Sequence, residues 1–437
     1  MKKILLILLD GVADRVYGEL DAQTPLEAAH TPNLDLIAEK GGSAALYPIA
    51  PGLVPPSEIP HFHLFGYAND PFPGRAVLES LGWGVEPPRD APVTHLGLRH
   101  VTPGPAGLAI TDWWPGEDDV EADARELVAG IAALESEGIR MEARYLGKSD
   151  SLLILHGGSE FITDSDPFFF TGYSVLNVSA LDAAADQGLA QRTARALNAY
   201  LRWCHSVLDD HPVNRRRVEQ ETRPLNMTVT KWTGRHYPLK DFKNRSGLNG
   251  TVIASARIYA GLAAALGMTY RHVDEDMQDP AREIAEKLVA ARAAFAQGAD
   301  FVHLHSKTAD EAAHTHSPQA KSDVIAASDR GLAGLWDWPS LEKEFVVAVT
   351  ADHATPSRGP MLHSGESVPF ALMGAGVRRD EITHFDERRA VHGSLGQLRA
   401  RDALPVLLNA ANRARFLGGR AAPDSGFGAP EVTPLTL

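Results

Sequence analysis

Phe345-Val-Val-Ala-Val-Thr350 is a strongly apolar run that leads directly into Asp352-His353. The same pattern occurs at Ile4-Leu-Leu-Ile-Leu-Leu9, which ends at Asp10, and at Phe301-Val-His-Leu-His305, which precedes Asp310. Short runs that are apolar on both faces and separated by helical stretches are typical of a parallel sheet covered by helices. Sites in such proteins form beyond the carboxyl ends of the strands, so we expect these carboxylates and imidazoles to converge there.

The converging groups are of the types that bind divalent metals. Carboxylate together with imidazole favours Mn²⁺, Zn²⁺, Co²⁺ or Fe²⁺ over Ca²⁺, and we take Mn²⁺ as the leading candidate, with Zn²⁺, Co²⁺ or Mg²⁺ as alternatives. Three carboxylates and one alkoxide would offset two such ions and leave a neutral site for a phosphate dianion. We therefore predict two metals, one held by Asp10, Ser57, Asp352 and His353 and the other held by Asp310, His314 and His363.

Pro55-Pro-Ser57-Glu-Ile-Pro-His61 offers the nucleophile that such a site needs. Ser57 follows two prolines and opens a stretch that could start a helix, where unpaired backbone N–H groups favour a bound phosphate. A serine hydroxyl becomes a good nucleophile when a metal or base activates it. The alternatives are that Ser57 only caps the helix and that His61 is only a structural histidine.

These residues resemble the alkaline phosphatase superfamily, and within it the archaeal-type cofactor-independent phosphoglycerate mutases. The resemblance covers both ends of the chain and, more thinly, its middle. The family's motifs are matched by Leu9-Asp10-Gly11, Thr31-Pro-Asn-Leu-Asp35, Pro51-Gly52, Ser57-Glu-Ile-Pro-His61, Gly66-Tyr67, Gly74-Arg75 with Glu79, His305-Ser-Lys307-Thr-Ala-Asp310 with His314, Ala351-Asp352-His353-Ala-Thr355-Pro356, His363-Ser-Gly and Val368-Pro369.

The resemblance implies a metal-dependent isomerase of glycolysis that interconverts 3-phosphoglycerate and 2-phosphoglycerate. It implies that Ser57 carries the phosphoryl group, that His61 and Lys307 steady it, and that Arg75 shapes the substrate side. The implied fold is alkaline-phosphatase-like α/β, with a mostly parallel sheet flanked by helices and a smaller inserted α+β domain.

The chain departs from this family where phosphoglycerate would be held. Trp113 and Glu117 stand after Asp112 where the family usually has arginines, and Lys231 replaces another arginine. Guanidinium groups grip phosphate and carboxylate bidentately, and neither lysine nor tryptophan reproduces that geometry. We name Asp112, Trp113 and Lys231 as candidate substrate-binding residues and expect weak binding of phosphoglycerate. The alternatives are a phosphatase, phosphotransferase or phosphonate-processing enzyme on another small substrate, and a non-catalytic metal-binding protein.

Composition indicates a globular protein of the cytoplasm. The 437 residues carry a formal charge of -14, which disfavours nucleic acid as a partner because phosphate backbones need a basic face. Cys204 is the single cysteine, which fits a reducing compartment. No run approaches the roughly twenty apolar residues of a membrane span. The expected partner is a small phosphorylated substrate, and the oligomeric state stays open.

The positions of the ligands suggest how the chain is divided. Because they come from both ends of the chain, we expect residues 1–85 and 246–437 to form the metal-binding, phosphoryl-transfer domain and residues 86–245 to form an inserted substrate or cap domain. Hydrophobic periodicity predicts helices over residues 121–137, 183–208, 279–297 and 317–335.

Overall fold

The computed structural model describes residues 2–112, 120–167, 172–416 and 435–436. It divides into two compact units, one formed by Met1–Asp70 with Leu239–Leu437 and the other by Pro71–Pro238. Both boundaries lie earlier in the chain than the expected 85/86 and 245/246. The reason is that α4 (Arg75–Gly82) packs on strands of the second unit. Phe242, at the start of α8 (Phe242–Ser246), instead contacts the ring of Phe65 edge-on and the ring of Phe301 at a tilt, both in the first unit.

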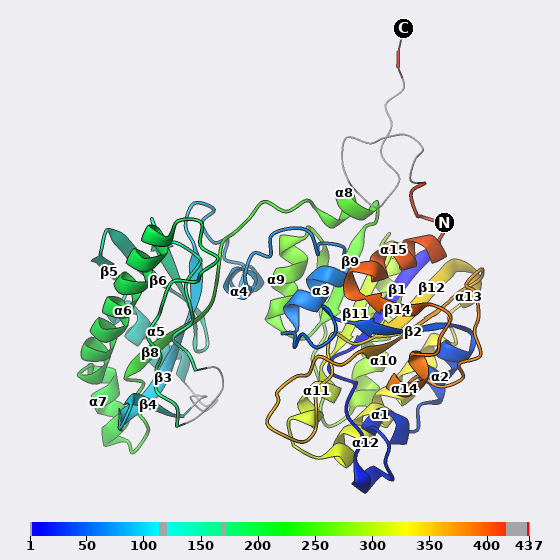
Figure 1. Ribbon diagram of the computed structural model, residues 1–437, viewed down its shortest axis with the longest axis horizontal. Coiled ribbons are helices and arrows are strands. Elements are labelled where there is room, and N and C mark those ends of the chain that lie inside the picture. The colour runs from blue at the N-terminus through cyan, green and yellow to red at the C-terminus, as the bar shows by residue number, and fades with distance from the viewer. Residues whose placement is uncertain (1, 113–119, 168–171, 417–434, 437) are drawn as a thin grey trace. The chain divides into compact units, whose positions relative to one another are not determined.

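The first unit contains an eight-stranded sheet that is mostly parallel (Figure 1). Only β13 runs antiparallel to its neighbours, and β11, β1 and β12 lie next to one another inside the sheet. The side chains of β11 and β12 are buried throughout, which agrees with their apolar sequences. The strand order is β10 (Thr269–His272), β9 (Gly250–Ala254), β11 (Phe301–Ser306), β1 (Lys3–Leu9), β12 (Phe345–Thr350), β13 (Val368–Met373), β2 (Gly41–Tyr47) and β14 (Gly396–Arg399).

Helices cover this sheet in two connected groups (Figure 1). One group is α3 (Glu58–Leu64), α9 (Arg257–Ala265) and α15 (Ala400–Ala410), and the other is α2 (Pro32–Glu39), α10 (Pro280–Ala296) and α12 (Pro318–Gly331). The predicted α/β architecture with a mostly parallel, helix-flanked sheet is therefore confirmed. Short elements complete the unit: η1 (Gly18–Leu20), α1 (Pro25–Ala28), α11 (Thr308–Ala313), η2 (Leu332–Leu335), α13 (Leu341–Glu344) and α14 (Glu387–Ala390).

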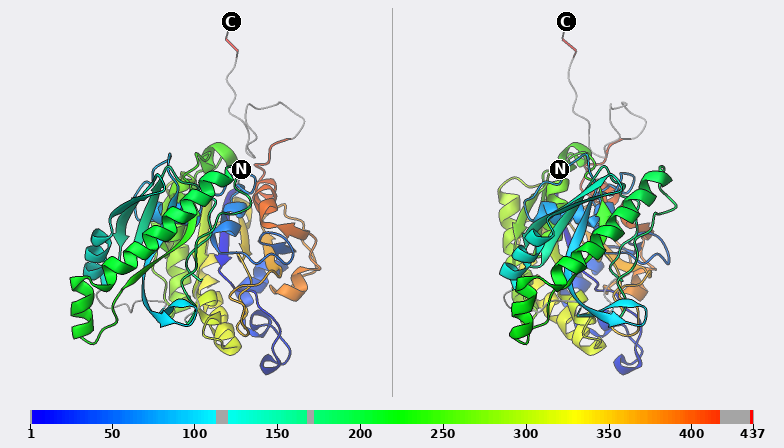
Figure 2. Two further views of the ribbon diagram at one scale, coloured as in Figure 1. Left: turned by 60° about the vertical axis from the view of Figure 1, so that its left-hand side comes forward. Right: turned by 90° about the vertical axis from the view of Figure 1, so that its left-hand side faces the viewer.

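The second unit is an antiparallel sheet with helices, as expected for an α+β insertion. Helix α6 (Gln187–Asp209) packs along the sheet against β5, β6 and β8 (Figure 2). The strand order is β4 (Gly107–Asp112), β3 (Val93–Gly104), β7 (Asp150–His156), β6 (Ile139–Gly147) and β5 (Ala133–Ser136), with β8 (Met227–Gly234) paired to β3. The remaining helices are α4, α5 (Val120–Gly130) and α7 (Pro212–Glu219).

The predicted helix over residues 121–137 is wrong in its second half. Helix α5 ends at Gly130, and the following residues form β5, which pairs with β6. Glu137 and Gly138 join these strands with positive φ angles of 53° and 74°, the conformation of a tight two-residue hairpin. The other three predicted helices correspond to α6, α10 and α12, the last continuing into η2.

The structure describes the single cysteine and the apolar content of the helices. Cys204 is a buried free thiol in the apolar core of the second unit. Over the described ranges, no helix is both long and apolar enough to cross a bilayer.

Candidate metal centre and active site

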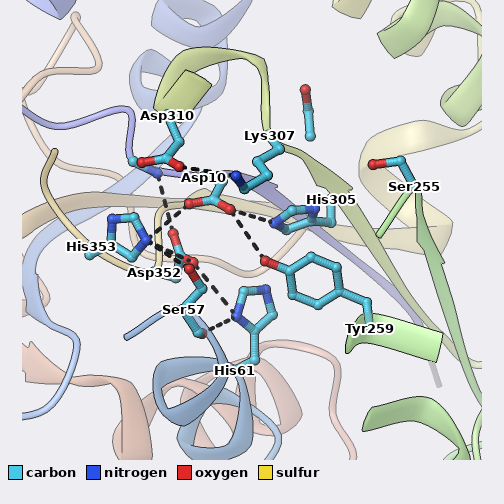
Figure 3. A network of polar contacts seen from close by, with 12 residues as sticks. Asp10, Ser57, His61, Ser255, Tyr259, His305, Lys307, Asp310, Asp352 and His353 are labelled. Atoms are coloured by element: carbon cyan, nitrogen blue, oxygen red, sulfur yellow. Dashed lines mark hydrogen bonds and ion pairs between the residues drawn. The ribbon is translucent and has the colours of Figure 1, made fainter. Parts of the chain in front are cut away.

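The strand ends bring the predicted carboxylates to one edge of the sheet. Strand β1 pairs in parallel with both β11 and β12, so Asp10, which follows β1, lies at the same edge as Asp352, which follows β12. Asp310 joins them from α11, directly after β11. Figure 3 shows these three carboxylates around His353, and all four side chains are almost completely buried.

Three groups of side chains have ligand atoms within 4.8 Å of one another. They are Asp10 with Asp352 and His353, Asp310 with His353 and His363, and His61 with His305 and Asp352. His353 thus lies between the two predicted metal sites. The rings of His353 and His363 stack with their centroids 3.6 Å apart.

His314 and Lys307 approach the same centre through Asp310. The His314 Nε2 atom lies 3.3 Å from Asp310 Oδ2, although His314 belongs to none of the three compact groups. Lys307 Nζ lies 3.4 Å from the same oxygen and also pairs with Glu311. Burial opposes the charge of Lys307, but the carboxylates of Asp310, Asp10 and Glu311 raise its pKa. Lys307 is therefore a cation at the edge of the carboxylate cluster.

Ser57 points into this centre. Its Oγ atom lies 3.1 Å from His353 Nε2, and it makes no side-chain hydrogen bond that would cap α3. The His61 Nδ1 atom lies 2.7 Å from the Ser57 carbonyl oxygen (Figure 3). Because a carbonyl can only accept, Nδ1 carries the proton, and His61 holds the backbone that presents the Ser57 hydroxyl.

Sequence reasoning assigned no role at the centre to His305, Tyr259 or Thr355. His305 Nε2 and the Tyr259 hydroxyl both lie 3.2 Å from Asp10 Oδ2 (Figure 3). The Thr355 hydroxyl donates to Asp310 Oδ1 at 2.7 Å. Alternation along β11 was a signal that His305 faces one side of the sheet, but Tyr259 lies on α9, where its sequence context gives no such signal.

The buried carboxylates of the centre favour a positive charge beside them. Burial and the Asp10 carboxylate raise the pKa of Asp352 well above its usual range. Burial opposes protonation of His353, but the carboxylates of Asp352 and Asp10 raise its pKa to about 9. Burial also opposes ionisation of Asp10, yet His353 and His305 lower its pKa.

The donor atoms fit divalent cations for a second reason. Asp352 Oδ2 and His61 Nε2 are buried and accept no hydrogen bond from any described residue. A buried carboxylate oxygen without a hydrogen-bond donor is unfavourable unless a cation compensates it, and in the described residues His353 approaches this oxygen with Nε2 at 3.4 Å. Mixed carboxylate and imidazole donors suit Mn²⁺, Zn²⁺ or Co²⁺.

Three of the remaining candidates, Arg75, Lys231 and Asp112, belong to the second unit. The Arg75 guanidinium carbon and Lys231 Nζ lie over the ring of Trp232, 4.0 Å and 4.1 Å from its centroid. Lys231 Nζ is also 3.5 Å from Asp166, which lies 3.2 Å from the Arg99 guanidinium.

The Asp166 carboxylate therefore partly offsets the charge of this cationic cluster.

Asp112 is the last residue of β4. Trp113 and Glu117 lie outside the described residues.

Comparison with known proteins identifies the relatives of this chain. The model of the Metalloenzyme superfamily matches residues 2–410. The 2,3-bisphosphoglycerate-independent phosphoglycerate mutase 2 of Methanocaldococcus jannaschii is 34% identical over 100% of this chain and 99% of its own length. The corresponding protein of Pyrococcus horikoshii is 32% identical over 95% and 99%.

Solved structures agree with these relatives. A Pyrococcus horikoshii protein superposes with a TM-score of 0.73 at 27% identity, covering 96% of this chain and 99% of that one. The cofactor-independent phosphoglycerate mutase of Thermoplasma acidophilum gives a TM-score of 0.59 at 26% identity, covering 94% and 100%.

Proposed function

This chain belongs to the Metalloenzyme superfamily, as a phosphoglycerate-mutase-like isomerase related to the archaeal 2,3-bisphosphoglycerate-independent enzymes, and we propose that it interconverts 3-phosphoglycerate and 2-phosphoglycerate through a phosphoserine at Ser57. The observation that carries the proposal is the position of Ser57 Oγ, 3.1 Å from His353 Nε2 within a cluster of buried carboxylates.

Two divalent cations, with Mn²⁺ as the leading candidate, complete the proposed site. When bound, they would lower the pKa of the Ser57 hydroxyl and polarise the phosphoryl oxygens. The proposed ligands are Asp10, Ser57, Asp352 and His353 for one ion and Asp310, His314 and His363 for the other.

The proposed reaction has two balanced half-reactions at Ser57. In the first, Ser57 Oγ attacks phosphorus, the new P–O bond forms, and the ester bond to glycerate breaks. The proton that Ser57 loses is balanced by the proton that the departing glycerate oxygen gains. In the second, the other glycerate hydroxyl attacks phosphorus, the bond to Ser57 breaks, and Ser57 regains a proton.

The surrounding residues position the nucleophile and the phosphoryl group. His61 holds the Ser57 carbonyl at 2.7 Å and so limits rotation of the backbone that carries the nucleophile. Lys307 supplies a charge that can stabilise the transferring phosphoryl oxygens. Arg75 and Lys231 are proposed to bind the anionic groups of the substrate, and a cytoplasmic location also remains a prediction.

A second candidate function is hydrolysis or transfer on another small phosphate. It is favoured by the second unit, where Lys231 and Arg99 both contact the Asp166 carboxylate. Cations that are already paired bind an anionic substrate less strongly than free guanidinium forks. In that case water or another acceptor, rather than glycerate, would take the phosphoryl group from Ser57.

One assay separates these functions. The chelated protein is reconstituted with Mn²⁺ and tested for phosphoglycerate interconversion and for phosphate release from a panel of small phosphates, including an activated aryl phosphate. A mutase kcat/KM of about 10⁴ M⁻¹s⁻¹ or more supports the isomerase. Phosphate release without isomerisation supports the hydrolase, and inertness toward every substrate supports a non-catalytic metal-binding protein.

A further inference from the structure

Lys321 is a completely buried ammonium that connects two loops of the first unit. It lies on α12, and its side chain has no exposed surface. Its Nζ donates to the carbonyl oxygens of Thr355 at 2.8 Å and Ala13 at 3.0 Å, and to Asp14 Oδ2 at 3.1 Å. All three donor positions of the ammonium are therefore used, and its charge is paired within the core.

The two loops are those that carry the proposed metal ligands. Ala13 follows Asp10 on the loop after β1, and Thr355 follows His353 on the loop after β12. The Thr355 amide donates to the Ala13 carbonyl at 3.0 Å, so Lys321 binds at the junction where these loops meet. Asp14 also accepts hydrogen bonds from the backbone and hydroxyl of Ser357, which ties the second loop further to the first.

The Thr355 side chain connects this junction to the metal centre through two hydrogen bonds. Its hydroxyl donates to Asp310 Oδ1 at 2.7 Å and therefore accepts from His353 Nδ1, which lies 3.0 Å away. With Nδ1 protonated, His353 Nε2 is left facing Asp10 and Ser57, at 3.1 Å from each. One residue thus contacts a ligand of each proposed metal site.

The junction between the two loops is closely packed at Gly11. Gly11 has φ of 62°, and a Cβ atom there would lie 2.4 Å from Thr355 Oγ1 and 2.8 Å from Asp310 Oδ1. Removal of the Lys321 ammonium would take one hydrogen bond from each of the Thr355 and Ala13 carbonyls and would leave the buried Asp14 carboxylate without its cationic partner in a closely packed interior. The loops would then have to shift, and the ligand atoms would shift with them.

We propose that Lys321 is a positioning residue that, through Thr355, fixes the positions of the ligands of both metal sites relative to one another. The inference rests on the proposed two-metal function. It differs from a simple structural role because a buried ion pair elsewhere in the unit would stabilise the fold without setting the ligand geometry. Lys287 provides that comparison, since it is equally buried and pairs with the buried Glu283 on α10, which accepts a hydrogen bond from the Ser306 hydroxyl at the end of β11 and from none of the proposed ligands among the described residues.

The test measures Mn²⁺ dissociation constants by calorimetry on the full-length, chelated protein. We compare wild type with Lys321→Met and with Lys287→Met, and record the circular dichroism and unfolding temperature of each. Lys321→Met should bind Mn²⁺ about 10- to 100-fold more weakly, the range found when groups that orient metal ligands are removed. Lys287→Met should lose unfolding stability while keeping wild-type Mn²⁺ affinity.

A second pair of variants keeps the test decisive if Lys321→Met does not fold. Thr355→Val removes the hydroxyl and should weaken Mn²⁺ binding, whereas Thr355→Ser keeps it and should restore affinity. With Co²⁺ as probe, the visible absorption bands should change in Lys321→Met and Thr355→Val but not in Thr355→Ser.

Three outcomes contradict these expectations. Unchanged Mn²⁺ affinity in Lys321→Met, or in Thr355→Val if Lys321→Met does not fold, would overturn the inference while leaving the proposed function intact. An equal loss of affinity in Lys287→Met would also overturn it, because the effect would then be general destabilisation. Wild-type protein that binds no Mn²⁺ would overturn the proposed function as well.

Discussion

Replacing Asp352 by asparagine should stabilise the metal-free protein and abolish the stabilisation that metal provides. The Asp352 side chain is fully buried, and its Oδ2 accepts no hydrogen bond from the described residues. Burial and the neighbouring Asp10 raise its pKa, so the metal-free folded state keeps a proton that the unfolded chain releases above about pH 4. The free energy of unfolding of the metal-free wild type must therefore fall as the pH rises from about 4 toward the raised pKa.

The magnitude follows from the cost of leaving a buried acceptor without a donor. That cost is about 1–3 kcal/mol for an uncharged group and more for a carboxylate, so metal-free Asp352→Asn should exceed metal-free wild type by at least about 1 kcal/mol at pH 7.5. Wild type should gain about 2.7 kcal/mol at a Mn²⁺ concentration of 100 times the dissociation constant, and Asp352→Asn should gain far less. Calorimetric unfolding scans of both proteins, with chelator and with Mn²⁺, measure the four values.

Asp310→Asn is the matched control because it makes the same chemical change in the same centre. Burial and Asp10 oppose ionisation of Asp310, but His314, His353 and Lys307 lower its pKa overall. A depressed carboxyl pKa contributes stability above the unfolded pKa, so metal-free Asp310→Asn should be less stable than wild type at pH 7.5. Both variants should lose the metal-dependent gain. If both metal-free variants shift in the same direction, our account of the charges at this centre is wrong.

Ser57→Ala should abolish turnover and the phosphorylated Ser57 peptide seen by mass spectrometry, while most Mn²⁺ binding remains; a variant that turns over at near the wild-type rate would show that Ser57 is not the carrier. Lys231→Met should raise KM for 3-phosphoglycerate roughly tenfold or more with a smaller change in kcat, since a charge-assisted hydrogen bond contributes about 1.5–3 kcal/mol. Steady-state kinetics beside the exposed control Lys243→Met check this, and an unchanged KM would remove Lys231 from the substrate site. Burial raises the pKa of Glu275 to about 7, so wild-type stability should fall between about pH 4.5 and 7 and this fall should be smaller in Glu275→Gln; identical pH profiles of unfolding would contradict the assignment.

Local sequence was sufficient for the strands that build the centre and for the residues that follow them. Runs such as Phe345–Thr350 are apolar on both faces, and this property alone indicates a buried parallel strand. Asp10 and Asp352 could then be placed at a common edge, because parallel strands end on the same side of a sheet. The family resemblance was also available from short motifs, and relatives that match along the whole chain confirm it.

Tertiary structure decided what those ligands contact. Tyr259 contacts Asp10 from α9, and Lys321 contacts the ligand-bearing loops from α12, and neither position differs in sequence pattern from an ordinary helical residue. The hairpin at Glu137-Gly138 was likewise hidden, because residues after α5 form a strand only when β6 lies beside them. Composition and hydrophobic periodicity indicate whether a segment is buried and which of its faces is apolar. The partner of a buried ammonium depends instead on how distant segments pack. The sequence by itself therefore determined the sheet and its candidate ligands, and only the fold determined which buried groups hold those ligands in place.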